Sequence, residues 1–224
     1  MDLLPGKVKN FILIDMKDAD PPSRRRTGRP LSFDREAALE QAMLLFWRHG
    51  YEATSLAELT RAMGVTSPSI YAAYGDKKGL FREAVARYLA QPLPPADMVA
   101  QAEDATAAAR WLLEGAAAMF TGEATPPGCL LASSAIAVSV EADDVRRELA
   151  AIRLGVEAAL RDKILADMAC GRLPAETDAV TLAAYVTSVI QGLSTLARDG
   201  APREKLMKVA RFALSAWPAR SVRT

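Results

Sequence analysis

The sequence predicts an all-α protein. No stretch alternates apolar and polar residues at period two between hairpin turns, as strands of an antiparallel sheet would require. From Asp34 onward, apolar residues recur at spacings of three and four, which is the period of an amphipathic helix. Ser, Thr or Asp precedes many of these patterns and Gly follows them, as is typical of helix starts and ends. We therefore expect about nine helices and no sheet.

Residues 1–31 show no sustained periodicity and contain several prolines, so we expect a flexible arm. The segment "SRRRTGRP", residues 23–30, holds Arg24, Arg25, Arg26 and Arg29 and no acid. Residues 1–91 carry 14 basic and 11 acidic side chains, whereas residues 92–224 carry 14 and 16. A basic stretch beside a neutral body is typical of a phosphate-binding arm, and a solubilising tail is the alternative.

Four helices are expected in residues 32–91. The first begins after Asp34, carries Leu39, Ala42, Met43 and Phe46 on one face, and ends at Gly50. In "SLAE", Ser55 and Glu58 have the spacing of a capping box, which opens a second helix that ends at Gly64.

The chain then starts a helix again almost at once. Thr66 or Ser67 can cap the third helix, and Pro68 suits its first turn, where no intrahelical amide bond is lost. Asp76 can cap a fourth helix that reaches about Pro92.

Residues 55–74 form a predicted helix-turn-helix, in which the second helix is built to enter the major groove of DNA. Thr66, Ser67 and Ser69 would let the backbone approach base edges and phosphates, while Ile70 should face inward. Tyr71 would reach a phosphate or a thymine methyl, and Lys77 a phosphate. A helix-Gly-helix corner used only for packing is the alternative.

The run "MGVTSPSIYAAYGDKKGLF", with Phe46, Gly50, Ser55, Leu56 and Leu59 before it, resembles the DNA-binding domain of the TetR/AcrR family of transcriptional repressors. The resemblance implies a three-helix DNA-binding domain over residues 32–91, with residues 92–224 as an effector-binding and dimerisation domain. Together with the arginines of the arm, the candidate DNA-binding residues are Ser55, Thr66, Ser67, Ser69, Tyr71, Tyr74 and Lys77.

Only helix signals follow in the second domain. We expect helices over residues 100–122, 129–140, 143–170, 176–200 and 202–217. The last two resemble the dimer interface of the family, and an apolar stripe with small residues between supports close packing. A core helix within one protomer is the alternative. The candidate interface residues are Tyr185, Val189, Gly192, Leu193, Leu196 and Phe212.

The family resemblance also implies a small-molecule effector in the second domain. Aromatic, Met and apolar side chains on its helices are candidates to line a pocket, although such residues are more often plain core. They are Trp111, Met119, Phe120, Cys129, Leu130 and Tyr185. Cys129 is expected near a helix start, where the dipole would favour thiolate, so a thiol sensor is a further possibility beside an inert core thiol.

Several classes of protein are disfavoured. His49 is the only histidine, and no P-loop, GxGxxG or HExxH stretch is present, so we expect no enzyme, no metal site and no cofactor. Two cysteines and the expectation of no membrane-spanning helix indicate a cytoplasmic protein.

The sequence therefore predicts a homodimeric repressor that binds a palindromic operator in double-stranded DNA and is released by a small molecule. One alternative is an all-α binding protein or enzyme whose helix-turn-helix is only structural. Another is a nonspecific architectural DNA-binding protein.

Overall fold

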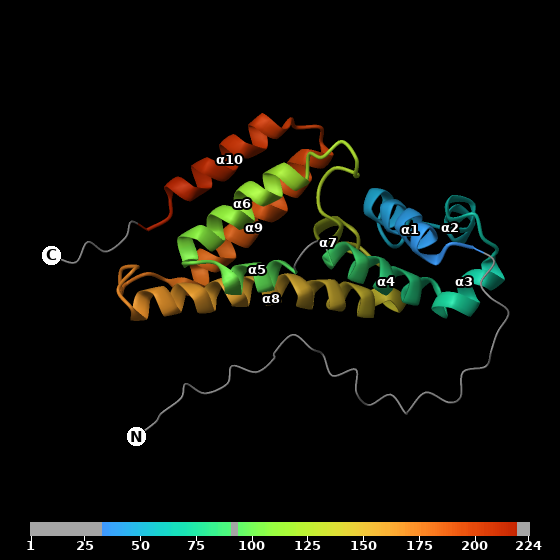
Figure 1. Cartoon of the computed structure of the whole chain (residues 1–224), viewed down its shortest axis with the longest axis horizontal. Helices are drawn as coiled ribbons and strands as arrows, with labels where there is room; N and C mark the ends of the chain where they lie inside the picture. Colours follow the sequence, from blue (N-terminus) through green and yellow to red (C-terminus); the bar gives the residue numbers. More distant parts are fainter. Residues whose placement is uncertain (1–32, 91–93, 219–224) are drawn as a thin grey trace, which may run out of the picture. The chain divides into compact units, whose positions relative to one another are not determined.

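The computed structural model describes residues 33–90 and 94–218, where all regular secondary structure is helical (Figure 1). The ends at residues 1–32 and 219–224 and the segment 91–93 lie outside the described residues. The helices are α1 Arg35–His49, α2 Leu56–Met63, α3 Ser67–Tyr74, α4 Lys77–Leu89, α5 Pro95–Gln101, α6 Ala105–Met119, α7 Leu130–Ser133, α8 Asp143–Ala169, α9 Ala179–Arg198 and α10 Arg203–Ser215, with a short 3₁₀ helix at Val140–Ala142. The predicted all-α class is confirmed.

Each of the first four helices begins at a residue whose side chain accepts a hydrogen bond from a first-turn amide. Asp34 caps α1, Thr66 caps α3 and Asp76 caps α4. Ser55 and Glu58 form the predicted capping box at α2, with both reciprocal bonds present. These caps satisfy amides that a helix leaves unpaired at its start, which is why the sequence located these helix starts closely.

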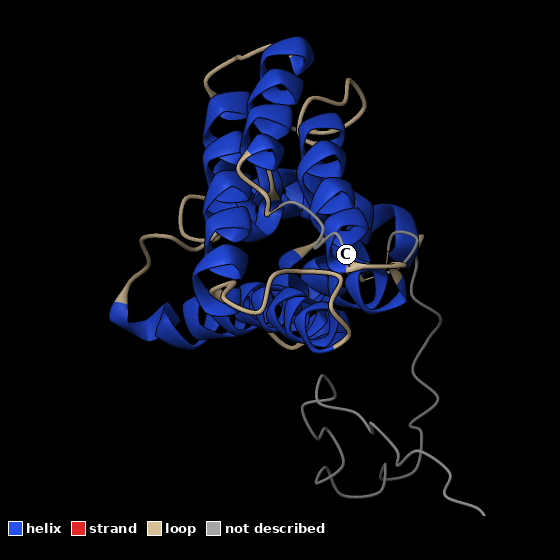
Figure 2. Ribbon diagram, turned by 90° about the vertical axis from the view of Figure 1, so that its left-hand side faces the viewer, coloured by secondary structure: helices blue, strands red, loops and turns tan. Residues whose placement is uncertain are grey.

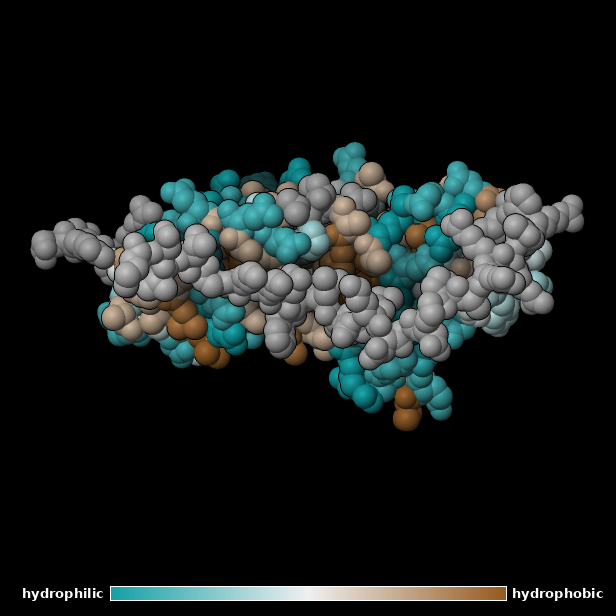
Figure 3. Space-filling view, turned by 60° about the horizontal axis from the view of Figure 1, so that its bottom comes forward, coloured by the Kyte–Doolittle hydropathy of each residue, from teal (hydrophilic) through white to brown (hydrophobic). Residues whose placement is uncertain are grey.

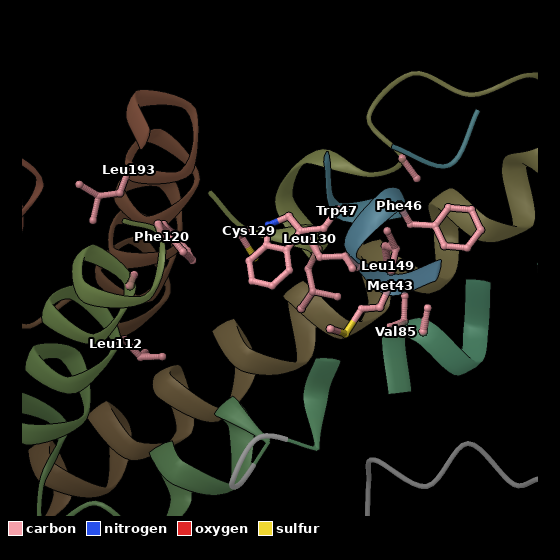
Figure 4. Close-up of a cluster of buried hydrophobic side chains, with 14 of the residues drawn as sticks. Met43, Phe46, Trp47, Val85, Leu112, Phe120, Cys129, Leu130, Leu149 and Leu193 are labelled. Atoms are coloured by element: carbon pink, nitrogen blue, oxygen red, sulfur yellow. The ribbon is translucent and has the colours of Figure 1, made fainter. Parts of the chain in front are cut away.

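Aromatic side chains fill the space between α1 and α4. The ring of Phe46 meets the ring of Phe81 edge-on at 5.0 Å, and Tyr51 approaches Phe81 at 5.1 Å. Trp47 makes a similar edge contact, 4.9 Å between centroids, with Tyr88 near the end of α4. Figure 4 shows Phe46 and Trp47 projecting from α1 in different directions, so one helix contributes to two aromatic contacts.

The later helices pack against one another through small side chains. α6 contacts α9 and α10, and α8 contacts α5 and α9 (Figure 1). Figure 2 shows that helices and their connecting loops make up the described residues. The buried side of α6 is rich in alanine, which allows neighbouring helix axes to approach closely. Its buried alanines are Ala105, Ala108, Ala109, Ala116 and Ala117.

The helix predicted over residues 100–122 is divided in two. α5 ends at Gln101, and α6 begins after Asp104, whose carboxylate accepts a hydrogen bond from the amide of Ala107. The buried carboxylate of Asp167 on α8 accepts a second first-turn amide, that of Ala105, at 2.7 Å. The start of α6 is therefore fixed both by a local cap, Asp104, and by a polar anchor from a distant helix, and only the second had no local sequence signal.

The helix predicted over residues 129–140 is wrong in length, because α7 ends at Ser133. The hydroxyl of Ser134 donates to the carbonyl of Phe46, and the carbonyl of Ser134 accepts the amide of Tyr51 at 2.7 Å. The hydrogen bonds of Ser134 to Phe46 and Tyr51 thus take the place of the intrahelical bonds that a longer α7 would make.

One helix of the described residues, α9, is long and apolar enough to cross a membrane by length and composition alone. The expectation of no such stretch was therefore wrong by this measure. In the fold α9 packs against α6, α8 and α10, and its remaining apolar surface belongs to the predicted dimer face.

Candidate functional site

The turn between α2 and α3 has the backbone that its sequence predicted. Gly64 adopts φ 66° and ψ 29°, the left-handed conformation, which is less strained for glycine than for residues with a Cβ atom. Val65 and Thr66 follow in extended or turn conformation, and α3 begins at Ser67 with Pro68 in its first turn. Two eight-residue helices joined this closely form a helix-turn-helix unit.

The two sides of α3 differ in chemistry. Ile70 is fully buried, as predicted, and holds the helix against its neighbours. Tyr71 is 49% exposed, and Thr66 and Pro68 are also exposed. The hydroxyls of Thr66 and Ser69 lie 2.9 Å apart, and Ser67 is partly exposed. The outward side of α3 therefore presents hydroxyl groups and one aromatic ring, which suits phosphate oxygens and base edges.

Tyr74 does not share that surface. It lies one helical turn after Ile70, and its ring is buried. The guanidinium of Arg35 stands 4.8 Å from the ring centroid, and the Tyr74 hydroxyl donates to the carbonyl of Arg35 at 3.4 Å. Burial raises the pKa of this phenol. The prediction of Tyr74 as a DNA-binding residue is therefore wrong, since the side chain anchors α3 to α1.

The other predicted DNA contacts near α3 carry internal bonds as well. Ser55 is exposed, but its hydroxyl and amide both bind Glu58. The Lys77 ammonium lies 4.5 Å from the centroid of the Tyr51 ring and 3.4 Å from the carbonyl of Glu52. Partial burial lowers the pKa of Lys77. Both side chains therefore already have contacts within the protein.

The predicted contacts of the arm, Arg24, Arg25, Arg26 and Arg29, lie outside the described residues. They stay a prediction from the sequence.

A cavity of about 180 Å³ lies among the later helices and the end of α4. Its wall is largely apolar, with one charged side chain, Arg153. The lining residues are Tyr88, Leu89, Pro95, Trp111, Leu112, Gly115, Ala116, Met119, Phe120, Cys129, Leu131, Ala132, Arg153, Val156, Thr187, Ile190 and Gln191. A largely apolar pocket with a few polar groups is the usual form of a small-molecule site.

The structure brings four of the six predicted effector residues to this cavity, namely Trp111, Met119, Phe120 and Cys129. Leu130 does not line it. That side chain is fully buried, and because consecutive residues of a helix point in different directions, its neighbour Leu131 takes the position at the wall. Tyr185 does not line the cavity either, since its hydroxyl reaches the carbonyl of Ala213 on α10.

Sequence reasoning missed the polar groups of the cavity. Arg153 comes from α8, and Thr187 and Gln191 come from α9. The sequence contains only one indication of a special role for Arg153: a basic residue stands there with apolar residues on both sides, within a long predicted helix. Tyr88, near the end of α4, also lines the cavity, and its place in the wall depends on the tertiary fold.

Cys129 is a buried thiol with a partner. The Tyr88 hydroxyl lies 3.4 Å from its sulfur, and burial is the largest cause of the raised pKa of the thiol. The helix that follows has only four residues, so its dipole is small. The amides of Leu131 and Ala132 at the start of this helix do lower the pKa of the thiol, as expected, but burial outweighs them and the net shift is upward.

The predicted dimer residues divide into two groups. Leu193 is fully buried within one protomer, so it belongs to the core and cannot contact a second copy. Phe212, on α10, is 80% exposed, and Gly192 is exposed on α9. Tyr185, Val189 and Leu196 are partly buried. An apolar surface therefore remains on these two helices, although one central residue was assigned to it wrongly.

Other exposed apolar side chains are scattered over the described residues. Figure 3 shows one face, on which such groups (brown) stand among hydrophilic ones (teal). They are Ile136, Val140, Leu154, Leu165 and Val180.

The cavity wall adjoins the helices of the helix-turn-helix region directly. Trp47 of α1 donates from its indole nitrogen to the carbonyl of Gly128 at 3.1 Å, and Figure 4 shows it beside Cys129. Arg198, at the end of α9, donates to the carbonyls of Trp47 and Arg48 at 3.1 and 3.0 Å. A change at the cavity can therefore reach the end of α1 through short chains of contacts.

Ion pairs add a second connection between α4 and α8. The Lys78 ammonium lies 2.7 Å from a carboxylate oxygen of Asp144, and Arg82 pairs with Asp144 and Glu148. These groups are partly exposed, so each pair contributes modestly to stability.

Comparisons with known proteins agree with this arrangement. The family model "Bacterial regulatory proteins, tetR family" matches residues 38–84, and the model "Tetracyclin repressor-like, C-terminal domain" matches residues 105–211. The HTH-type transcriptional repressor ComR of Escherichia coli (strain K12) is 36% identical over 197 residues, which cover 87% of this chain and 94% of ComR. The repressor BdcR of the same strain is 30% identical over 190 residues, which cover 84% of this chain and 91% of BdcR.

Among solved structures, a cysteine mutant of the TetR family transcriptional regulator CifR, complexed with 26 bp double-strand operator DNA, superposes with a TM-score of 0.80. Its sequence is 43% identical, and the match covers 85% of this chain and 100% of that one. The chain belongs to the TetR family of bacterial regulatory proteins and is a DNA-binding transcriptional regulator.

Proposed function

We propose that this protein is a cytoplasmic transcriptional repressor without enzymatic activity. It binds a palindromic operator as a homodimer and leaves the operator when a small molecule occupies the cavity. Repressor relatives and a relative crystallised on operator DNA support the first part. The outward side of α3 carries the proposal, because it is the surface of the helix-turn-helix that is free of core packing and rich in hydroxyl groups.

In this proposal Tyr71 and the hydroxyls of Thr66, Ser67 and Ser69 contact the operator. Lys77 binds a phosphate beside the start of α4 after it leaves the ring of Tyr51. Ser55 contributes from the start of α2. The arginines of the arm add contacts that depend on charge and carry little sequence information.

The dimer forms through the exposed apolar surface of α9 and α10, with Phe212, Gly192, Val189, Leu196 and Tyr185 contributing. A two-fold dimer presents two copies of α3 to two half-sites, which explains why the operator should be palindromic.

The central experiment titrates the protein against DNA from upstream of its own coding sequence and against a random duplex, at several salt concentrations. We expect tighter binding to the upstream DNA and affinity that falls as salt rises. Tyr71→Phe should weaken specific binding by about 1 kcal/mol if the hydroxyl bonds a phosphate. Arg110→Ala is the matched control, because this side chain is exposed on α6, away from α3.

The two alternatives give different results in this titration. Equal affinity for every duplex would indicate an architectural DNA-binding protein. Absence of binding to either duplex, by a folded dimer, would leave the helix-turn-helix a purely structural element.

A further inference from the structure

Arg153 is the one charged side chain in the wall of an otherwise mostly apolar cavity. It is about half-buried, on the middle of α8, and its guanidinium donates to the carbonyl of Leu131. Among the described residues, none of the ion pairs includes Arg153. A guanidinium has five N–H donors in a planar fork, so a single carbonyl leaves most of them without a protein acceptor.

The carboxylate nearest in sequence does not neutralise it. Glu157 stands one turn further along α8, and its Oε2 accepts a hydrogen bond from the Thr187 hydroxyl at 2.7 Å. Arg146, two turns earlier on the same helix, adds repulsion, while burial is the largest cause of the lowered pKa of Arg153. The protein therefore holds a poorly compensated positive charge at the wall of an apolar site.

The remaining polar groups of the wall are engaged or neutral. The Tyr88 hydroxyl lies against the Cys129 sulfur, and Thr187 is bonded to Glu157. Elsewhere in the wall, Trp111, Met119 and Ile190 offer only apolar surface or a ring. The volume of about 180 Å³ is close to that of a cavity that encloses a single benzene ring, about 150 Å³.

We propose that the effector of this protein is a small organic acid, with a body about the size of one ring and a carboxylate that binds Arg153 through two N–H groups. This inference rests on the proposed function and names the chemical class of its ligand. A planar carboxylate matches the guanidinium fork, and the apolar wall accepts the rest of the molecule. A neutral molecule of the same shape would leave the guanidinium without its partner.

The same contact provides a route to the DNA-binding helices. A carboxylate bound to the remaining N–H groups of Arg153 draws the guanidinium toward the cavity and strains its hydrogen bond to the carbonyl of Leu131, which loosens α7 on that side. Ser134, directly after α7, holds the carbonyl of Phe46 and the amide of Tyr51. Loosening of α7 therefore alters the support of α1, and through it the placement of α3.

The test is calorimetric titration of the full chain, without DNA, using two acids and their matched amides. The probes are benzoate with benzamide and hexanoate with hexanamide. We expect at least one acid to bind about tenfold more tightly than its amide. Arg153→Gln should reduce that ratio to about twofold or less, and Arg153→Lys should give an intermediate ratio because it keeps the charge without the fork. Arg161→Gln, on the same helix but outside the cavity wall, is the matched control and should leave the ratio unchanged.

Equal binding of acid and amide by the unaltered protein would overturn the proposal, and so would the absence of acid binding below about 10 mM. This comparison needs no variant, so it decides the matter even if Arg153→Gln fails to fold. Operator titration is a separate measurement. Acid binding by a protein that ignores DNA would support this site and refute the proposed function, whereas operator binding without acid binding would do the reverse.

Discussion

The first group of helices, α1–α4, and the second group, α5–α10, are packed by different kinds of side chain. Between α1 and α4, large rings fill the space, and all four of the first helices begin with a side-chain cap. In the second group α6 packs through alanine, and α5, α7, α8 and α10 lack a side-chain cap bond. The first group leaves little room to change shape, while the second closes around a cavity.

This difference suits the two tasks that we propose. A DNA-reading helix needs fixed orientation, because base contacts depend on geometry. A ligand site needs space and helices whose positions respond to what fills it. The contacts of Trp47 and Arg198 join the two groups at the end of α1.

The largest expected effect separates core from surface within the second group. Leu193→Arg would bury a charge without a partner and should unfold the protein. Phe212→Glu, on the neighbouring helix, should leave a folded monomer at micromolar concentration, since Phe212 is 80% exposed. Circular dichroism and light scattering distinguish these results. A folded Leu193→Arg protein would place that residue outside the core, and a dimeric Phe212→Glu protein would place the interface elsewhere.

A substitution in the first group tests whether the rings determine its rigidity. Phe46→Ala removes a fully buried ring that contacts both Phe81 and Tyr51. We expect the free energy of unfolding to fall by about 3–5 kcal/mol, measured by denaturant titration. A loss under about 1 kcal/mol would show that the space between α1 and α4 repacks easily and that the rings do not make this group rigid.

Replacing a helical glycine by alanine should have a smaller effect on stability, and a different one in each group, at Gly79 in α4 and at Gly115 in α6. A Cβ atom on Gly79 would lie 2.0 Å from the carbonyl oxygen of Tyr74, so Gly79→Ala must shift the junction of α3 and α4. We expect a cost of about 1–3 kcal/mol and weaker operator binding.

Gly115 has nothing within 4 Å of such an atom, so Gly115→Ala should be neutral or stabilise α6 by up to about 1 kcal/mol. Because Gly115 lines the cavity, the added methyl group should still weaken ligand binding. Thermal melts and operator titrations of both variants check the pair. Equal stability of the two alanine variants would contradict the steric argument.

The same contrast explains how much the sequence could predict. The capping box of Ser55, the turn at Gly64 and the inward Ile70 depend on residues a few positions apart, and all were predicted correctly. Tyr74 was assigned to the wrong face because the resemblance to a motif does not state which side of the helix each residue occupies. The reason for a glycine at position 79, the nearby carbonyl of Tyr74, depends on how two helices meet.

In the second group the errors have a different origin. α7 ends early because Ser134 bonds to α1, and α6 begins where it does partly because of Asp167 on α8. The cavity role of Arg153 and the core position of Leu193 follow from long-range packing as well. Periodicity marks an apolar stripe, but it does not tell whether the same chain or a second copy covers it.

The smallest expected effect concerns the ion pairs that join the two groups. The hydrogen bond from Lys78 lowers the pKa of Asp144 below its ordinary value of 3.8. A lowered pKa in the folded state means that the stabilisation is present above the ordinary value and is lost as the pH falls through the folded value. Asp144→Asn removes this contribution, so the difference in unfolding free energy between the two proteins should shrink as the pH is lowered from neutrality to below 3.8. Denaturant titrations over that range measure it, with Glu123→Gln, at an exposed position in the loop after α6, as control. A constant difference at all pH values would show that the Lys78–Asp144 pair contributes no net stability between α4 and α8.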